Sequence, residues 1–109
     1  GYRAGKTLAS IPGVTAVFVS SDEMAFGLLK ALNESGLSVP EDVSVVGVDD
    51  IALAEYAAPP LTTVRQPFAA LGEATATRLI DQIEERDATV TPPVEAELIV
   101  RSSTGVAPN

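Results

Sequence analysis

Two stretches, separated by eight residues, place the strongest limits on what this chain can fold into. Residues 43–48 are almost entirely apolar and are followed by two acids, Asp49 and Asp50. Residues 59–67 then begin with two prolines, continue with threonines and a valine, and end at Pro67. The prolines fix φ and prevent a helix, the β-branched residues favour a strand, and Pro67 suits the first turn of a new helix. The two stretches predict a buried strand and an extended crossover between packed layers, the kind of segment at which two-lobed proteins hinge.

The rest of the chain alternates between strand and helix patterns. Strands are predicted at 15–19, 43–48, 61–64 and 95–101, and helices at 2–10, 22–35 and 67–86. Ser20 and Glu23 have the spacing of a capping box, although Ser21 or Asp22 could cap the second helix instead, and Gly36 is placed to end it. This order predicts an α/β fold with a parallel sheet flanked by helices. The strands at 15–19 and 43–48 should be neighbours, with helix 22–35 on one face.

Composition excludes several classes of function. The chain has no Cys and no His, which excludes thiol catalysis, Ser-His-Asp hydrolysis, zinc sites built on these residues, and disulfides. A carboxylate-only Mg²⁺ or Ca²⁺ site remains possible. The net charge of −8 repels phosphate backbones, so DNA contacts are expected only from residues outside this chain. No apolar run is long enough for a membrane span, and no membrane partner is expected.

Acidic and hydroxyl side chains follow both of the first two strands. Residues 20–22 come after the first strand, and Asp49 and Asp50 after the second. The carboxyl ends of parallel strands are where ligands bind in open α/β sheets, and a carboxylate can accept two hydrogen bonds from adjacent sugar hydroxyls. We therefore expect Asp22 and Asp49 at the same sheet edge. For Asp22 the pattern favours a helix cap over a ligand contact, whereas for Asp49 a ligand contact and a solvated loop acid are both open.

Two basic residues and one charged run have simpler interpretations. Arg65 and Arg101 flank predicted strands, where an arginine is more often solvated or paired with an acid than part of an anion site. The run at 84–87, Glu-Glu-Arg-Asp, is interpreted as a solvated helix end.

Several stretches together resemble the effector-binding core of the LacI/GalR family of bacterial transcription regulators. They are residues 15–27, residues 39–50, the proline-rich crossover, Leu71-Gly72, and residues 98–104. The resemblance spans essentially all of the chain and implies two α/β lobes like those of type I periplasmic sugar-binding proteins. Residues 1–66 would then be part of the C-terminal lobe, and 67–109 the crossover helix with a final strand returning between lobes. The chain would be the last third of such a protein, and the apolar face of helix 67–86 would be exposed without the other lobe.

The resemblance also implies roles for individual residues. Asp49 matches the family's effector-binding carboxylate, and Ser21 a position where the family commonly has an Asn that contacts the effector. The shorter Ser21 side chain puts that contact in doubt or points to a different or larger ligand. Gln66 and Phe68 fall at the hinge crossing, where family members touch the ligand. Phe26 matches a subunit-interface position, with core packing as an equal alternative.

The function expected from the resemblance is the effector-sensing core of a cytoplasmic LacI-type transcription regulator. The effector would be a sugar or a related small polar molecule, the protein a homodimer without cofactor or enzymatic activity, and operator DNA would be bound only through an amino-terminal headpiece. One alternative is a periplasmic sugar-binding protein of a transporter with the same fold. Another is an enzyme or phosphoacceptor in which Asp22, Asp49 and Asp50 hold Mg²⁺; against it, the only lysines are Lys6 and Lys30, with none late in the chain.

Overall fold

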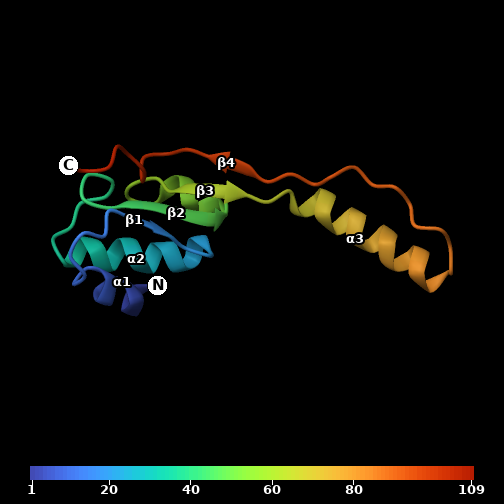
Figure 1. Cartoon of the computed structure of the whole chain (residues 1–109), viewed down its shortest axis with the longest axis horizontal. Helices are drawn as coiled ribbons and strands as arrows, with labels where there is room; N and C mark the ends of the chain where they lie inside the picture. Colours follow the sequence, from blue (N-terminus) through green and yellow to red (C-terminus); the bar gives the residue numbers. More distant parts are fainter. The chain divides into compact units, whose positions relative to one another are not determined.

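The computed structural model describes residues 1–109 and shows an α/β chain (Figure 1). Its elements are, in order, α1 (Tyr2–Leu8), β1 (Ala16–Phe18), α2 (Asp22–Glu34), β2 (Ser44–Asp49), the 3₁₀ helix η1 (Ala52–Tyr56), β3 (Thr62–Arg65), α3 (Phe68–Ile83) and β4 (Glu97–Ile99). The chain forms two compact units: residues 1–65 with 97–109, and residues 66–96. The returning strand β4 thus belongs to the first unit. Whether residue 66 marks a boundary between two lobes stays a prediction.

The four strands form one sheet in the order β1-β2-β3-β4. β1 pairs with β2 in parallel, and β2 pairs with β3 in parallel, so the predicted neighbours and direction are confirmed. β4 runs antiparallel to β3, with Thr63 opposite Ile99. This reversal follows from the chain path, because β3 leads out of the first unit and β4 comes back beside it. The carboxyl ends of β1, β2 and β3 therefore share one edge of the sheet.

The core of the first unit is aliphatic, as the shortage of aromatic residues requires. Helix α2 packs on one face of the sheet, and α1 packs on α2 (Figure 1). The largest fully buried apolar side chains are Leu28, Leu32, Val45 and Leu61. Helix α2 spans nearly all of the predicted residues 22–35, and Gly36 follows it with a φ of 77°. That left-handed conformation is one that glycine adopts without strain, which explains the end of the helix there.

Ser103 completes the sheet where the amino ends of β2 and β3 would otherwise leave unpaired groups. Its carbonyl oxygen accepts a hydrogen bond from the Val45 amide at 2.8 Å. Its hydroxyl donates to the Val45 carbonyl at 2.6 Å and accepts from the Thr62 amide at 2.8 Å. The side chain is fully buried, so the segment after β4 is an integral part of the first unit.

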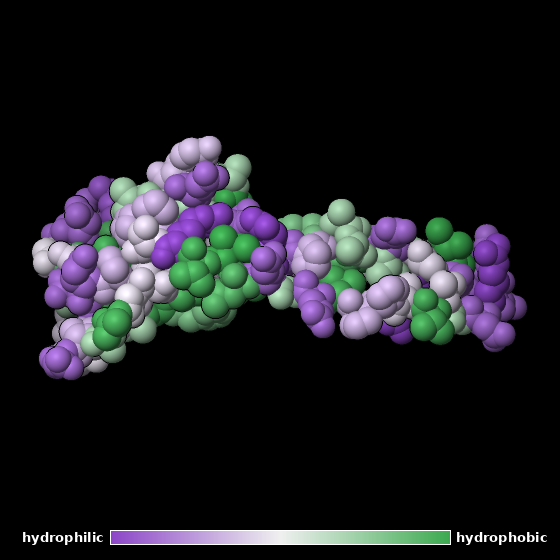
Figure 2. All heavy atoms as spheres, turned by 90° about the horizontal axis from the view of Figure 1, so that it is seen from above, coloured by the Kyte–Doolittle hydropathy of each residue, from purple (hydrophilic) through white to green (hydrophobic).

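The second unit consists of α3 and the chain that returns from it. Helix α3 begins after Pro67, and its buried Asp81 accepts hydrogen bonds from the Thr89 amide at 2.9 Å and hydroxyl at 2.6 Å. In Figure 2 this unit lies at the right, and hydrophobic side chains reach its surface between hydrophilic ones. The exposed apolar residues of the helix are Phe68, Leu71, Leu79, Ile80 and Ile83. The predicted exposure of this face is therefore confirmed. None of the helices combines the length and the hydrophobicity that spanning a bilayer requires.

Candidate functional site

Ser21 is the residue that caps helix α2. It adopts an extended conformation, and its hydroxyl accepts a hydrogen bond from the Met24 amide at 3.3 Å. The side chain of an N-cap serine satisfies one of the four free amides at a helix start. Of the three candidate caps, the structure selects Ser21, so neither Ser20 nor Asp22 is the cap. The interpretation of Asp22 as a helix cap, which the sequence pattern favours over a ligand contact, is therefore wrong. Ser21 lies at the sheet edge predicted for the ligand, and its contact with an effector stays a prediction.

Asp22 is fully buried and faces the sheet. One carboxylate oxygen, Oδ2, accepts a hydrogen bond from the Ile51 amide at 2.9 Å, and the other, Oδ1, accepts from the Thr63 hydroxyl at 2.5 Å. The carboxylate thus joins α2, β3 and the loop after β2. Gly47 leaves the space for it, since a Cβ at position 47 would lie 2.3 Å from Asp22 Oδ1. The sequence pattern did not reveal this role, because the partners are 29 and 41 residues away.

The turn that begins at Asp49 has an unusual backbone. Asp49 has a φ of 117° and Asp50 a φ of 53°, both in the region that residues with a side chain rarely adopt. The two amides that follow Asp49 are both hydrogen-bonded to buried side chains. The Asp50 amide donates to the Thr63 hydroxyl at 3.4 Å, a long hydrogen bond, and the Ile51 amide donates to the Asp22 carboxylate. Asp49 is half-buried and lies beside Arg65 in the parallel register of β2 and β3. As predicted, Asp22 and Asp49 lie at the same edge of the sheet.

The Asp50 carboxylate is held by two arginines. Arg65 Nε donates to Asp50 Oδ2 at 2.7 Å, and Arg101 Nη2 donates to Asp50 Oδ1 at 2.6 Å. The Asp50 side chain is only 6% exposed. Its burial would raise the pKa of this carboxyl, but the hydrogen bonds and charges of Arg101 and Arg65 outweigh burial, so the pKa is lowered from its ordinary value. The prediction that these arginines are solvated or paired with an acid, and not an anion site, is confirmed, since both pair with Asp50.

This ion-paired cluster, Asp50 with Arg65 and Arg101, connects three segments of the first unit. Asp50 follows β2, Arg65 is the last residue of β3, and Arg101 follows β4. Arg101 also donates from Nη1 to the Leu61 carbonyl at 2.8 Å, and Arg65 lies 3.7 Å from Glu97 at the start of β4. The strand by which the chain leaves the first unit and the strand by which it returns are therefore bound to the same carboxylate. Two arginines at strand ends were the only sequence signal for this arrangement.

Two of the predicted ligand contacts belong to the second unit. Gln66, its first residue, is half-buried, and Phe68, at the start of α3, is 57% exposed. Gln66 follows Arg65 directly and Phe68 is three residues after Arg65, as the crossover interpretation requires. Their contact with an effector stays a prediction.

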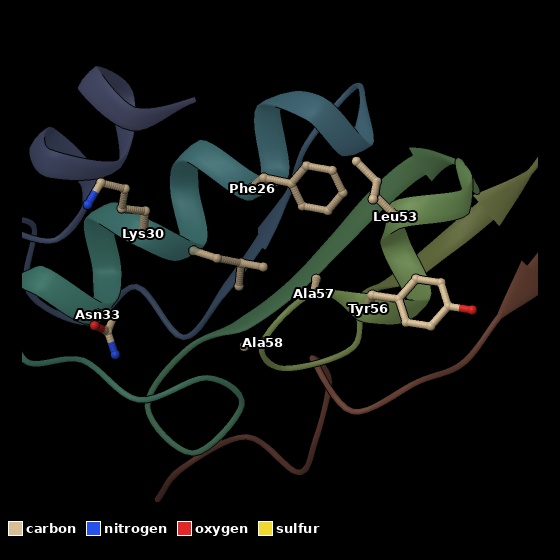
Figure 3. Close-up of a pocket in the computed structure, with 8 residues that line it drawn as sticks. Phe26, Lys30, Asn33, Leu53, Tyr56, Ala57 and Ala58 are labelled. Carbon is tan, nitrogen blue, oxygen red and sulfur yellow. The ribbon is translucent and has the colours of Figure 1, made fainter.

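Phe26 lines an apolar groove between α2 and the η1 segment. The groove has a volume of about 480 Å³ and is lined by Phe26, Leu29, Lys30, Asn33, Leu53, Tyr56, Ala57 and Ala58. Figure 3 shows the Phe26 ring facing Leu53, with Lys30 and Asn33 further along the helix. Phe26 also packs against the core, whereas Leu53 and Tyr56 are 63% and 76% exposed. The groove and the core thus share Phe26, and its assignment to a subunit interface stays a prediction.

The acids at the sheet edge are not arranged as a metal site. In a chain without His or Cys, the principal metal-binding side chains are Asp and Glu. No three or more of them lie close enough together to bind one metal ion. Asp22 is occupied by the Ile51 amide and the Thr63 hydroxyl, and Asp50 by its two arginines. These internal bonds count against the magnesium-dependent alternative.

Comparison with known proteins agrees with this geometry. The family model of the periplasmic binding protein-like domain matches residues 2–104. The HTH-type transcriptional regulator MalR of Streptomyces coelicolor is 47% identical over 98 residues, which cover 86% of this chain and 28% of MalR. The structure of a LacI family transcriptional regulator from Lactobacillus casei with bound sucrose is similar with a TM-score of 0.80 and 36% identity, covering 94% of this chain and 39% of that one. The lac repressor dimer bound to operator and the anti-inducer ONPF gives a TM-score of 0.82 and 34% identity, covering 94% and 36%.

The chain spans only about a quarter of the length of the curated relatives that it matches. Within that length the family model extends over nearly the whole chain, and the relatives and solved structures named above are transcription regulators. The sheet with its acid-bearing carboxyl edge, the crossover at 59–67 and the returning strand are all present. The chain therefore belongs to the periplasmic binding protein-like domain family, as part of an effector-binding domain of the LacI/GalR type.

Proposed function

We propose that this chain is part of the effector sensor of a LacI-type transcription regulator, which changes its operator binding when a small polar ligand, such as a sugar, is bound. The observation that carries the proposal is Asp49, a carboxylate on a constrained turn at the carboxyl ends of the parallel strands β1, β2 and β3. The sucrose bound to the Lactobacillus casei relative supports a carbohydrate as the ligand class. The role is that of a binding protein and not of an enzyme, and it is exercised in the cytoplasm, where DNA is located.

A sensor of this kind works by population shift. An effector that binds one arrangement of two lobes more tightly than another moves the protein toward that arrangement. Asp49 and Ser21 would supply hydrogen bonds from the first unit, those of Asp49 being charge-assisted, while Gln66 and Phe68 would contribute from the crossover. DNA contact is assigned to a headpiece outside this chain, because a net charge of −8 opposes contact with phosphates.

The alternative of a periplasmic sugar-binding protein for a transporter has the same fold but less support. The relatives that match this chain at 34–47% identity, namely MalR, the Lactobacillus casei protein and the lac repressor, are transcription regulators. A helix-turn-helix segment in the gene that encodes this chain would support the regulator, whereas a signal peptide would support the transporter protein.

Replacing Asp49 with Asn tests the proposed site in the whole regulator. The substitution keeps the size of the side chain but turns one acceptor oxygen into a donor. Binding should weaken by about 1.5–3 kcal/mol, the range for hydrogen bonds to charged groups. The measurement is calorimetric titration with glucose, sucrose and cellobiose, together with release of operator DNA. Operator binding should persist while the response to the sugar is lost.

Glu41→Gln is a suitable control, because Glu41 is an exposed acid in the loop before β2, at the opposite end of that strand. It should leave both affinity and DNA release unchanged. Equal affinity and equal response in the Asp49 variant and the parent protein would remove Asp49 from the site. A parent protein that binds none of the three sugars would reject the carbohydrate class.

We also propose that the groove lined by Phe26 is covered by a second copy of the protein. Leu53 and Tyr56 are large, exposed and adjacent to Phe26, and hydrophobic patches of this kind mark interaction surfaces. The lac repressor, which is similar to this chain, is described as a dimer. Because Phe26 packs against the core and also lines the groove, a second copy that binds in the groove would pack directly against the core of the first unit.

Leu53→Glu tests this interface, because it places a charge in the groove without removing a buried core residue. The dimer dissociation constant should rise at least about tenfold, the equivalent of about 1.4 kcal/mol, measured by analytical ultracentrifugation. Ile11→Glu is the matched control, since Ile11 is an apolar residue of similar size, 47% exposed and outside the groove. An unchanged dissociation constant for the Leu53 variant would place the subunit contact elsewhere.

A further inference from the structure

Asp22 and Thr63 are buried polar residues that the proposed ligand contacts do not use. Both side chains are completely buried, yet both are polar, and burying a polar group is costly unless it is hydrogen-bonded. The Thr63 hydroxyl donates to Asp22 at 2.5 Å. A buried carboxylate and hydroxyl in direct contact at the carboxyl edge of the sheet need a physical explanation beyond packing.

Their remaining partners provide that explanation. The Thr63 hydroxyl accepts from the Asp50 amide, and Asp22 accepts from the Ile51 amide. These are the two amides that directly follow Asp49. The bonds thus fix the backbone on the carboxyl side of Asp49, at a turn whose positive φ angles at Asp49 and Asp50 would otherwise relax.

We propose that Asp22 and Thr63 are positioning residues for the effector site: they hold the turn in the conformation that presents Asp49. This inference rests on the proposed role of Asp49 in binding. Neither side chain needs to touch the effector, because Asp22 is enclosed between α2, β3 and the loop after β2. The arrangement lowers the conformational freedom that Asp49 would lose on binding, which is the general way in which preorganisation strengthens affinity.

The adjacent residue Thr62 offers a matched control for a test. Thr62 is also buried, on the same strand, but successive side chains of a strand point to opposite faces. Its hydroxyl contacts Thr104 at 2.9 Å and accepts from the backbone amide of Arg101 at 2.9 Å, so neither bond involves an amide of the turn. Arg101 reaches Asp50 through its side chain, which Thr62 does not hold. Thr62→Val and Thr63→Val therefore each remove one buried hydroxyl without changing the shape of the side chain.

The first measurement is amide hydrogen exchange by NMR in the 109-residue chain. Exchange at Asp50 should accelerate about tenfold in Thr63→Val, the equivalent of its one lost hydrogen bond. Exchange at Ile51 should also accelerate, because the Asp22 carboxylate that holds this amide loses the Thr63 hydroxyl. Both amides should remain near the parent rate in Thr62→Val. Thr63→Ser, which keeps the hydroxyl, should restore the slow exchange. Parent-like exchange at both amides in Thr63→Val would overturn the proposal, as would equal acceleration in the two valine variants.

The second measurement is titration of the whole regulator with whichever of glucose, sucrose and cellobiose binds the parent protein. Its dissociation constant should rise about tenfold in Thr63→Val, stay unchanged in Thr62→Val despite a similar loss of thermal stability, and recover in Thr63→Ser. An unchanged dissociation constant in Thr63→Val would reject the positioning role. If no sugar binds the parent protein but exchange at the turn responds as expected, the carbohydrate proposal fails, while the hydrogen bonds still hold the turn.

Discussion

Replacing Gly47 with alanine is expected to destabilise the first unit by about 4 kcal/mol, combining overpacking with the loss of charge-assisted hydrogen bonds. The new Cβ would lie 2.3 Å from Asp22 Oδ1 and 3.0 Å from a methyl group of Leu61. Real Cβ atoms do not approach other atoms so closely, so Asp22 must move. Because Asp22 binds both the Ile51 amide and the Thr63 hydroxyl, its displacement also breaks the support of the turn. Urea denaturation followed by circular dichroism measures the change in the free energy of unfolding.

Gly72→Ala is the matched control for this prediction. Gly72 lies within α3, where an added Cβ meets nothing within 4 Å. Alanine is a better helix former than glycine, so this variant should be stabilised by up to about 1 kcal/mol. Equal stability of the Gly47 variant and the parent chain would mean that the carboxylate of Asp22 does not occupy the place described here.

Replacing Asp50 with alanine is expected to destabilise the first unit by about 3 kcal/mol, because it leaves Arg101 without its acid in a largely buried position. The Arg101 side chain is 16% exposed and the Asp50 side chain 6% exposed. Arg65 is 51% exposed and adds little, since water screens an exposed pair. Glu97→Gln is the control: Glu97 is 68% exposed and 3.7 Å from Arg65, so its loss should cost less than about 0.5 kcal/mol.

The Asp50→Ala variant should also be less sensitive to acid than the parent chain. The pKa of Asp50 is lower in the folded protein than its ordinary value of 3.8. Its ionised form therefore stabilises the fold above about pH 4, and this contribution is lost as the pH falls through the folded pKa. As the pH is lowered from about 5 through the folded pKa of Asp50, the parent chain should lose more stability than the Asp50→Ala variant. Urea denaturation at a series of pH values measures this loss. A parallel loss in both proteins would exclude Asp50 as a source of acid sensitivity.

Local pattern was sufficient to predict the elements and their order. The apolar run at 43–48 became β2, the prolines at 59–60 precede β3, and Pro67 directly precedes α3. These features act within a few residues of the chain: proline fixes its own φ, β-branched residues favour extended backbone, and apolar periodicity selects a helix face. The parallel pairing of β1 and β2 followed from the helix between them. Asp49 could be assigned to the sheet edge for the same reason, and its role in the effector site came from the resemblance to a family.

Local sequence patterns were thus enough to predict the α/β alternation, the crossover and the position of the acid-bearing edge. The role of each polar residue at that edge became clear only from the folded arrangement. In the fold, Ser21 and not Asp22 caps the helix. Asp22 is buried against Thr63 and the Ile51 amide, and Asp50 forms ion pairs with Arg65 and Arg101. Local patterns could not predict these pairings because the partners are far apart along the chain. A carboxylate binds whichever donors the packed sheet brings within 3 Å of it, and these donors come from segments 15 to 51 residues away, which no local pattern connects.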